Sequence, residues 1–324
     1  MRKAQSAVSS AADDEVVQLR ALWRRYEHHC TQTNSCPSAV LRQDILHQID
    51  RQEPLKKCLL LEKRGRTVYP FKLLELLDCK LTEGSLERLS KAAGISFLTT
   101  LCLDYTRVGP EGLKGLLSGG LGVSRISSLS LCYCGLGSWS GTLLASLLTN
   151  SSVRELYING NELQCGGAIE LLKPVAENSQ KLAEIQNRTT SITGKKTKKK
   201  REKTKSGHGA AGGPWLEKLH MSDNSIDDSG KEGSNQLNKF LEILCIIIKF
   251  SSCLTELDLG ENHIGEDGGK VFLEALRERQ AAKLSAIKIQ VSTRMSTETF
   301  SAILKSAKEL KSGKKRRKTK GKKK

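Results

Sequence analysis

One arrangement of apolar and polar residues recurs along the 324-residue chain. In LTELDLGENHIGEDGG, residues 254–269, leucines alternate with polar residues, and Asn262 follows three residues after the last leucine of LDL. Alternate side chains of a strand point to opposite faces, so the leucines of LDL should face a core while Glu256 and Asp258 face outward. The pattern therefore predicts a short strand that ends at a polar turn.

Five earlier stretches repeat this spacing, and a later one, LSAIKIQVS, repeats it without the asparagine. A polar side chain at the place of Asn262 can bond the backbone groups that a sharp, buried turn leaves bare. Asparagine does so with two donors and an acceptor, whereas cysteine and threonine do so less completely. The six residues predicted to form this turn ladder are Cys79, Thr106, Cys134, Asn161, Asn224 and Asn262.

A helix is predicted after each turn, because apolar residues then recur at helical spacing, as in GPEGLKGLLSGG and GEDGGKVFLEALRER. Glycines fall at the start of these helices, where the missing side chain permits close packing. They are Gly112, Gly167, Gly230 and Gly268. One strand and one helix per repeat stack into a curved solenoid, with strands inside and helices outside.

These residues resemble the leucine-rich repeat family, in particular the class with repeats of roughly 28 residues that ribonuclease inhibitor typifies. The resemblance covers about residues 71–310, apart from an insert near 188–213. It implies an α/β solenoid of horseshoe shape, with a concave parallel β-sheet and convex helices.

The ends of the chain and one internal segment depart from the repeat. Apolar residues at helical spacing over 14–50 match no repeat, which favours a helical N-terminal cap on the first repeat over an independent domain. Segment 54–70 is ambiguous and is placed with the repeats. The predicted organisation is a flexible start at 1–12, the cap at 13–53, repeats at 54–187, a disordered lysine-rich insert at 188–213, repeats at 214–310 and a disordered basic tail at 311–324.

Composition supports a folded protein with an aliphatic core, since 38% of the residues are hydrophobic and only 4% are aromatic. The formal net charge is +18, and two lysine-rich runs, 195–205 and 314–324, supply +16 of it. The repeats are therefore nearly neutral and are not themselves predicted to bind phosphate.

The lysine runs favour nuclear localisation or weak, sequence-independent binding of nucleic acid, and solubilising tails are the alternative. The residues that would act are Lys198, Lys199, Lys200, Arg201, Lys314, Lys315, Arg316, Arg317 and Lys318.

The N-terminus lacks the apolar segment of a signal peptide, and no stretch approaches the roughly 18 apolar residues of a membrane span. An intracellular protein is expected, cytoplasmic or nuclear, and the resemblance also allows a cilium or flagellum. The ten cysteines are expected to be reduced, and their spacing suits no zinc site.

No catalytic motif and no cofactor-binding motif is found, and the six histidines are scattered. His220 is expected to be a contact residue rather than a base. What remains is the outward side of the strands, where Tyr157 would be the anchor for a partner. The predicted partner-binding residues are Glu75, Asp104, Glu155, Tyr157, Asn159, His220, Glu256 and Asp258, which otherwise are solvated strand residues.

The sequence thus favours a non-enzymatic scaffold that binds a protein partner on its concave face, and the acidic lining suggests basic or polar groups on that partner. The alternative is a nuclear or nucleic-acid-associated protein that acts through the lysine runs. The family resemblance adds a third and weaker hypothesis, a regulator similar to the GTPase-activating protein of Ran, although the tail here is basic where that protein is acidic.

Overall fold

The computed structural model describes residues 72–192, 215–229 and 233–309, together with 16–51 except for positions 18, 22, 29, 33–36 and 38. The predicted segments 1–12, 54–70 and 311–324 lie outside these residues.

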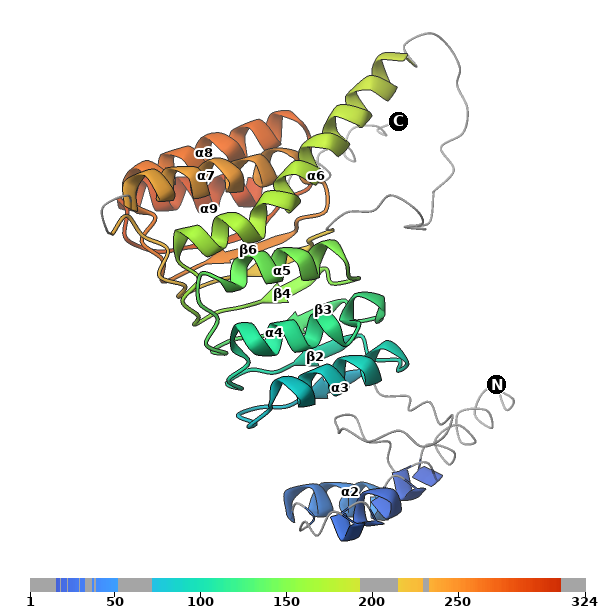
Figure 1. Ribbon diagram of the computed structural model, residues 1–324. Helices are drawn as coiled ribbons and strands as arrows, with labels where there is room; N and C mark the ends of the chain where they lie inside the picture. The colour runs from blue at the N-terminus through green and yellow to red at the C-terminus, as the bar shows by residue number, and fades with distance from the viewer. Residues whose placement is uncertain are drawn as a thin grey trace, which may run out of the picture.

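Seven short strands form one sheet in chain order, and every neighbouring pair is parallel (Figure 1). The middle residue of each three-residue strand is buried and its neighbours are half-buried, which is the alternation that the sequence predicts. The strands are β1 (Leu73–Glu75), β2 (Thr100–Cys102), β3 (Ser128–Ser130), β4 (Glu155–Tyr157), β5 (Lys218–His220), β6 (Glu256–Leu259) and β7 (Lys288–Val291).

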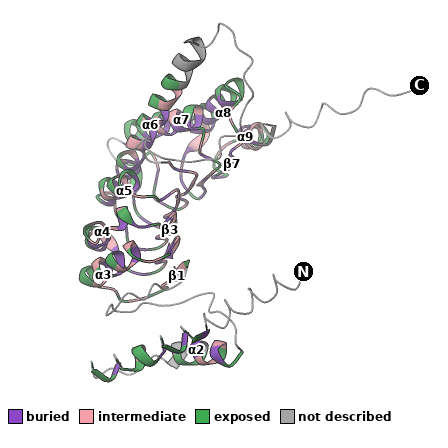
Figure 2. Ribbon diagram, turned by 90° about the vertical axis from the view of Figure 1, so that its right-hand side faces the viewer, coloured by how far each residue is buried: buried purple, intermediate pink, exposed green. Residues whose placement is uncertain are grey.

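A helix follows each strand, and the helices lie together along one side of the sheet (Figure 2). This confirms the prediction of an α/β repeat fold. The helices are α3 (Glu83–Gly94), α4 (Gly109–Ser118), α5 (Ser140–Thr149), α6 (Gln164–Ile192), α7 (Gly233–Phe250), α8 (Gly265–Ala281) and α9 (Thr297–Glu309), with a 3-10 turn η1 (Leu121–Val123) between α4 and β3.

The core is a single cluster of buried side chains that runs from Leu74 to Ile303, between the sheet and the helices. Most of its members are leucine, isoleucine or valine, with Phe240 and Phe272 as large exceptions. Each fully buried side chain of this kind contributes about 1.5–3 kcal/mol of stability relative to exposure. The strand leucines therefore hold the repeats together, and the outward residues are free of that role.

Strand β4 pairs directly with β5, although the predicted insert separates them in sequence, and Leu156 lies beside Leu219. Helix α6, however, continues to Ile192, about one helical turn past the predicted start of the insert at 188. Once a helix is started, each added residue gains a hydrogen bond without needing an apolar face. Absence of apolar residues was therefore a poor marker of where α6 ends.

The N-terminal region contains helical residues between 16 and 32 and helix α2 (Ala39–Arg51). Four of its buried residues, Leu19, Trp23, Ile45 and Ile49, form a cluster that is distinct from the core of the repeats. The helices expected over 14–50 are therefore present, while their role as a cap stays a prediction.

Close packing at the helix starts is confirmed at three glycines. A Cβ atom would lie 2.6 Å from a Leu86 carbon at Gly112, 2.7 Å from the Ser138 carbonyl oxygen at Gly167 and 2.4 Å from an Ile264 carbon at Gly268. Gly230 lies outside the described residues.

Candidate interaction surface

The turn ladder joins each repeat to the one before it. Asn161 is buried, and its Oδ1 accepts the backbone N–H groups of Cys134 and Leu136, both at 3.0 Å. Its Nδ2 donates to the carbonyl oxygens of Leu131 at 2.9 Å and Ile158 at 2.8 Å. The side chain thus bonds backbone groups of two consecutive turns.

Asn262 repeats this arrangement, because its Oδ1 accepts from the N–H of Asn224 and its Nδ2 donates to the carbonyl of Met221. Asn224 is different. Its Nδ2 donates to the carbonyls of Ile158 and Ser222, but its Oδ1 is buried and accepts no hydrogen bond from any described residue.

The other ladder positions bond less completely, as their chemistry predicts. Thr106 Oγ1 accepts from the N–H of Cys79 at 3.1 Å and donates to the carbonyl of Leu76 at 3.0 Å. The thiol of Cys134 donates to the carbonyl of Leu103 at 3.1 Å. Cys79 is half-buried, and its thiol contacts only its own turn through the Leu77 carbonyl, as far as the described residues show.

The outward side chains of the seven strands form a second surface, here called the strand face. Six of the predicted binding residues lie on it as half-buried side chains, and they are Glu75, Glu155, Tyr157, His220, Glu256 and Asp258. The strand pairing places them in two rows that cross the sheet.

Charges alternate along the first row of the strand face. Glu155 lies beside Lys218, which lies beside Glu256, which in turn lies beside Lys288. Lys218 Nζ is 2.8 Å from Glu155 Oε1, and Lys288 Nζ bonds Glu256 Oε1. The bond from Lys288 lowers the pKa of the Glu256 carboxyl, and at Glu155 bonds from Lys218 and Ser128 outweigh burial and also lower the pKa.

The second row brings Tyr157, His220 and Asp258 together. The rings of Tyr157 and His220 are 4.7 Å apart and tilted, and the Tyr157 hydroxyl donates to Glu155 at 3.3 Å. His220 lies between two carboxylates, with Nδ1 3.5 Å from Asp258 and Nε2 3.4 Å from Glu256. Burial raises the pKa of Asp258, but the bonds from His220 and from the Gly260 N–H outweigh it, so the net shift is downward.

The two remaining predicted residues, Asp104 and Asn159, lie two residues beyond the ends of β2 and β4. Asp104 accepts the Ser130 hydroxyl at 2.6 Å and the Cys132 N–H at 2.8 Å, and Asn159 Oδ1 accepts the Ser222 N–H at 2.9 Å. Both side chains therefore tie neighbouring repeats together rather than standing free on the strand face.

Three thiols cluster near Asp104, at Cys102, Cys132 and Cys134. Burial is the main cause that raises the pKa of each, to about 11 for Cys102 and about 12 for Cys134. The raised pKa keeps these thiols protonated at neutral pH, which makes them poor nucleophiles.

Among the described residues, no group of three or more histidine, cysteine, aspartate or glutamate side chains is arranged to hold a metal ion. No helix in the described part of the chain is both long and apolar enough to cross a membrane. The candidate residues of the two lysine runs, at 198–201 and 314–318, lie outside the described segments.

Lys288 was missed at the sequence level, although it flanks Ile289 as Glu256 flanks Leu257. The same alternation of buried and outward residues indicates an outward side chain at Lys288, in the last repeat, which lacks the asparagine. No sequence pattern indicates the pairing of charges from strand to strand. It depends on which residues of neighbouring strands lie side by side, and these residues are far apart in sequence.

The family model described as Leucine Rich repeat matches the chain at residues 214–231 and 250–273. The first segment contains β5 and Asn224, and the second contains β6 and Asn262. The two matched repeats lie in a single parallel sheet whose other strands carry the same pattern. Together these observations support leucine-rich repeats in this chain, with two of them matched directly.

Proposed function

We propose that the protein is a non-enzymatic scaffold that binds a protein partner on the strand face. Leucine-rich repeat domains commonly mediate protein interactions, and a rigid, laterally extended sheet suits that use. One observation carries the proposal. In strands such as β4 and β5 the middle side chain is buried in the core, while its two neighbours are half-exposed on the strand face. The outward side chains can therefore serve a partner without cost to the core.

The centre of the proposed contact is Tyr157 with His220. An aromatic side chain on a rigid platform gives a large contact area with little loss of conformational entropy. The tilted packing of the two rings and the bond from Tyr157 to Glu155 hold this platform in one conformation. Binding here would order few additional side chains.

The pairing of charges changes the expected chemistry of the partner. Glu155 and Glu256 pair with Lys218 and Lys288, and Asp258 lies beside His220, so much of the negative charge of the strand face is already engaged. A partner that is polar and carries little net charge suits this surface better than a strongly basic one, because it leaves these pairs intact.

The proposal is tested by affinity purification of the full-length protein at low and at high salt, beside a variant lacking 195–205 and 314–324. Tyr157→Ala with Asp258→Asn should lose protein partners that the parent retains at high salt. Glu170→Ala with Lys173→Ala, two exposed positions on α6, is the matched control and should retain them. If the strand-face variant still retains these partners at high salt, the proposal is wrong.

The lysine runs support a second function, association with nucleic acid or the nucleus. The supporting observation is that they hold nearly all of the net charge of the chain. Bound nucleic acid that disappears with the runs or at high salt would favour it. A GTPase regulator is the weakest proposal, since no residue of the strand face points to it.

Three finer features of the fold belong to the same proposal. They are membership of the ribonuclease-inhibitor-like class with repeats of roughly 28 residues, a horseshoe whose concave side is the strand face, and an N-terminal helical cap over 13–53. The side-by-side stacking of strands, with bulkier helices on the other side, supports such curvature.

A further inference from the structure

A different surface lies where the strands turn into the helices. The residue before each member of the turn ladder has a left-handed backbone, with φ between 50° and 65°. The N–H of Tyr105 donates to the Cys132 carbonyl at 2.9 Å and that of Tyr133 to the Asn159 carbonyl at 2.8 Å, so successive turns lie side by side. These residues, here called the left-handed row, are Asp78, Tyr105, Tyr133, Gly160, Asp223 and Glu261.

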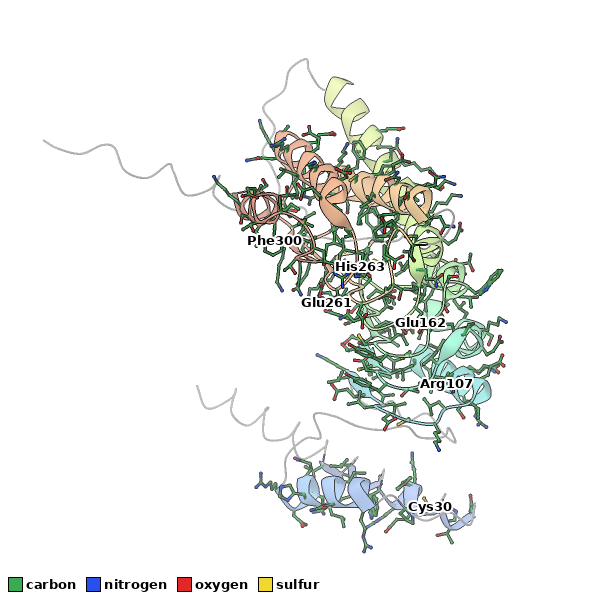
Figure 3. The ribbon with its side chains drawn as sticks, turned by 90° about the vertical axis from the view of Figure 1, so that its left-hand side faces the viewer. Cys30, Arg107, Glu162, Glu261, His263 and Phe300 are labelled. Carbon is green, nitrogen blue, oxygen red and sulfur yellow. The ribbon has the colours of Figure 1, made fainter. Side chains whose placement is uncertain are left out.

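Figure 3 shows the edge of the molecule to which this row belongs. Its labelled residues Arg107, Glu162, Glu261 and His263 come from the turns after β2, β4 and β6 and follow one another along that edge. The edge is separate from the strand face, so the inference drawn from it goes beyond the function proposed above.

Two tyrosines of the row form an exposed, ordered stack. The rings of Tyr105 and Tyr133 are 5.0 Å apart and parallel to within 1°, while 61% of Tyr105 and 47% of Tyr133 are exposed. A Cβ atom at Gly160 would lie 2.0 Å from the Tyr133 ring, so that ring covers the glycine backbone. The next position of the row is therefore left without a side chain, and the stack rests on it.

The backbone conformation makes these tyrosines unusual. Positive φ angles are uncommon for residues other than glycine, and asparagine and aspartate are the ones that tolerate them best. Asp78 and Asp223 fit that preference, whereas Tyr105 and Tyr133 do not. Since both side chains are exposed, burial in the core does not account for their presence.

Carboxylates occupy the rest of the row. Asp78, Asp223 and Glu261 are exposed, and no lysine or arginine of the described segments forms a salt bridge with them. This distinguishes them from the carboxylates of the strand face. Arg107 and Lys80 lie in the first two turns, so the negative charge is concentrated beyond Gly160.

We propose that the left-handed row binds an extended segment of a protein partner that is rich in lysine and arginine. The faces of stacked tyrosines attract cations, and the exposed carboxylates further along the row attract the next cations of the same segment. Two aromatic rings before Gly160, and beyond it two carboxylates that pair with no lysine or arginine of the described segments, thus complement a chain of repeated positive charge rather than an acidic one.

The test measures the affinity of the full-length protein for a short labelled peptide of alternating lysine and serine, by fluorescence anisotropy at low salt. Tyr105→Asn with Tyr133→Asn removes both rings but keeps a residue type that accepts the left-handed backbone. This variant should bind the peptide about tenfold more weakly. Asp223→Asn with Glu261→Gln should also weaken binding. Tyr105→Phe with Tyr133→Phe keeps both rings and should bind the peptide as tightly as the unchanged protein does.

Two controls separate this surface from others. Phe97→Ala truncates an exposed aromatic on the opposite edge, which is packed against Arg125, and Tyr157→Ala removes the anchor of the strand face. Neither should change peptide binding, so this inference and the proposed function fail independently.

Three results would overturn the inference. They are unchanged binding by the double asparagine variant, equal binding of a peptide with glutamate in place of lysine, and binding that occurs only after deletion of 195–205 and 314–324. The last would assign the row to the lysine runs of this chain rather than to a partner.

Discussion

Arg279 shows how much a single side chain can do in the last repeats. It is fully buried in α8, and its guanidinium donates to the carbonyl oxygens of Ile248 at 2.8 Å, Ser251 at 2.7 Å and Ser285 at 2.7 Å. Helix α7 ends at Phe250, so the first two are carbonyls at its C-terminus, which lack partners within the helix. Burial lowers the pKa of Arg279 to about 10, which leaves it charged at neutral pH.

Replacing Arg279 with methionine should lower the free energy of unfolding by about 3 kcal/mol or more, because several buried carbonyls lose their donor at once. Chemical denaturation followed by circular dichroism measures this. Arg277→Met is the matched control, since that side chain is 62% exposed and, within the described part of the chain, pairs only with Glu274, three residues away. It should change stability by less than about 0.5 kcal/mol. Equal effects of the two substitutions would contradict the structural role of Arg279.

The turn ladder makes a graded prediction at the same scale. Asn161→Ala removes the side-chain partner of two buried N–H groups and of the Leu131 carbonyl, and one of two side-chain donors to the Ile158 carbonyl, and should cost about 2–4 kcal/mol. Asn224→Ala should cost less, because Asn224 Oδ1 accepts no bond from a described residue. Thermal unfolding of the two variants side by side checks the order, and a larger loss at Asn224 would show that the ladder is not graded by these bonds.

At the scale of the elements, glycines control how closely consecutive helices approach. A Cβ atom at Gly141, in the first turn of α5, would lie 2.1 Å from the carbonyl oxygen of Gly167 in α6. Because both groups belong to the backbone, neither can rotate away. At Gly84, in α3, an added Cβ atom would meet no neighbouring group within 4 Å.

Gly141→Ala should therefore destabilise the protein by about 1–3 kcal/mol, as overpacking does. The same change at Gly84 should be neutral or stabilising by up to about 1 kcal/mol, since alanine is the better helix former. The difference in melting temperature between the two variants gives the answer. Similar shifts at both sites would mean that α5 and α6 are not packed backbone to backbone.

At the scale of the whole molecule, the core and the turn ladder were accessible from the sequence because both are periodic. Leu101, Leu129 and Leu156 occupy the same place in successive repeats, so one physical argument covers all of them. The extent of α6 was not accessible in this way, because its last turns need no apolar face. Arg279 was missed because one arginine in a polar helix has no periodic counterpart.

The surface was harder to predict than the core. The sequence places Glu155 and Glu256 on the outward side of their strands, but it does not say that Lys218 and Lys288 lie beside them. That neighbourhood depends on sheet register across repeats of unequal length. The tyrosine stack was missed for the same reason, since Tyr105 and Tyr133 become neighbours only when two turns are placed side by side.

The connection between the N-terminal helices and the repeats makes a last prediction. Trp23 is buried with Leu19, Ile45 and Ile49 in a cluster of its own. If residues 13–53 cap the first repeat, this cluster and the repeats should unfold together, because solenoid repeats are stabilised by their neighbours. Replacing Trp139 and Trp215 with phenylalanine leaves Trp23 as the single tryptophan, whose fluorescence then reports on the cluster alone.

In that variant, the melting curve from Trp23 fluorescence should coincide with the curve from far-ultraviolet circular dichroism, to which the helices of the repeats contribute most. Adding Ile45→Ala should lower both midpoints by the same amount, since it creates a cavity in the cluster at a cost of about 2–5 kcal/mol. A Trp23 transition at lower temperature, moved by Ile45→Ala while the main transition stays in place, would instead mean that the N-terminal helices form an independent domain.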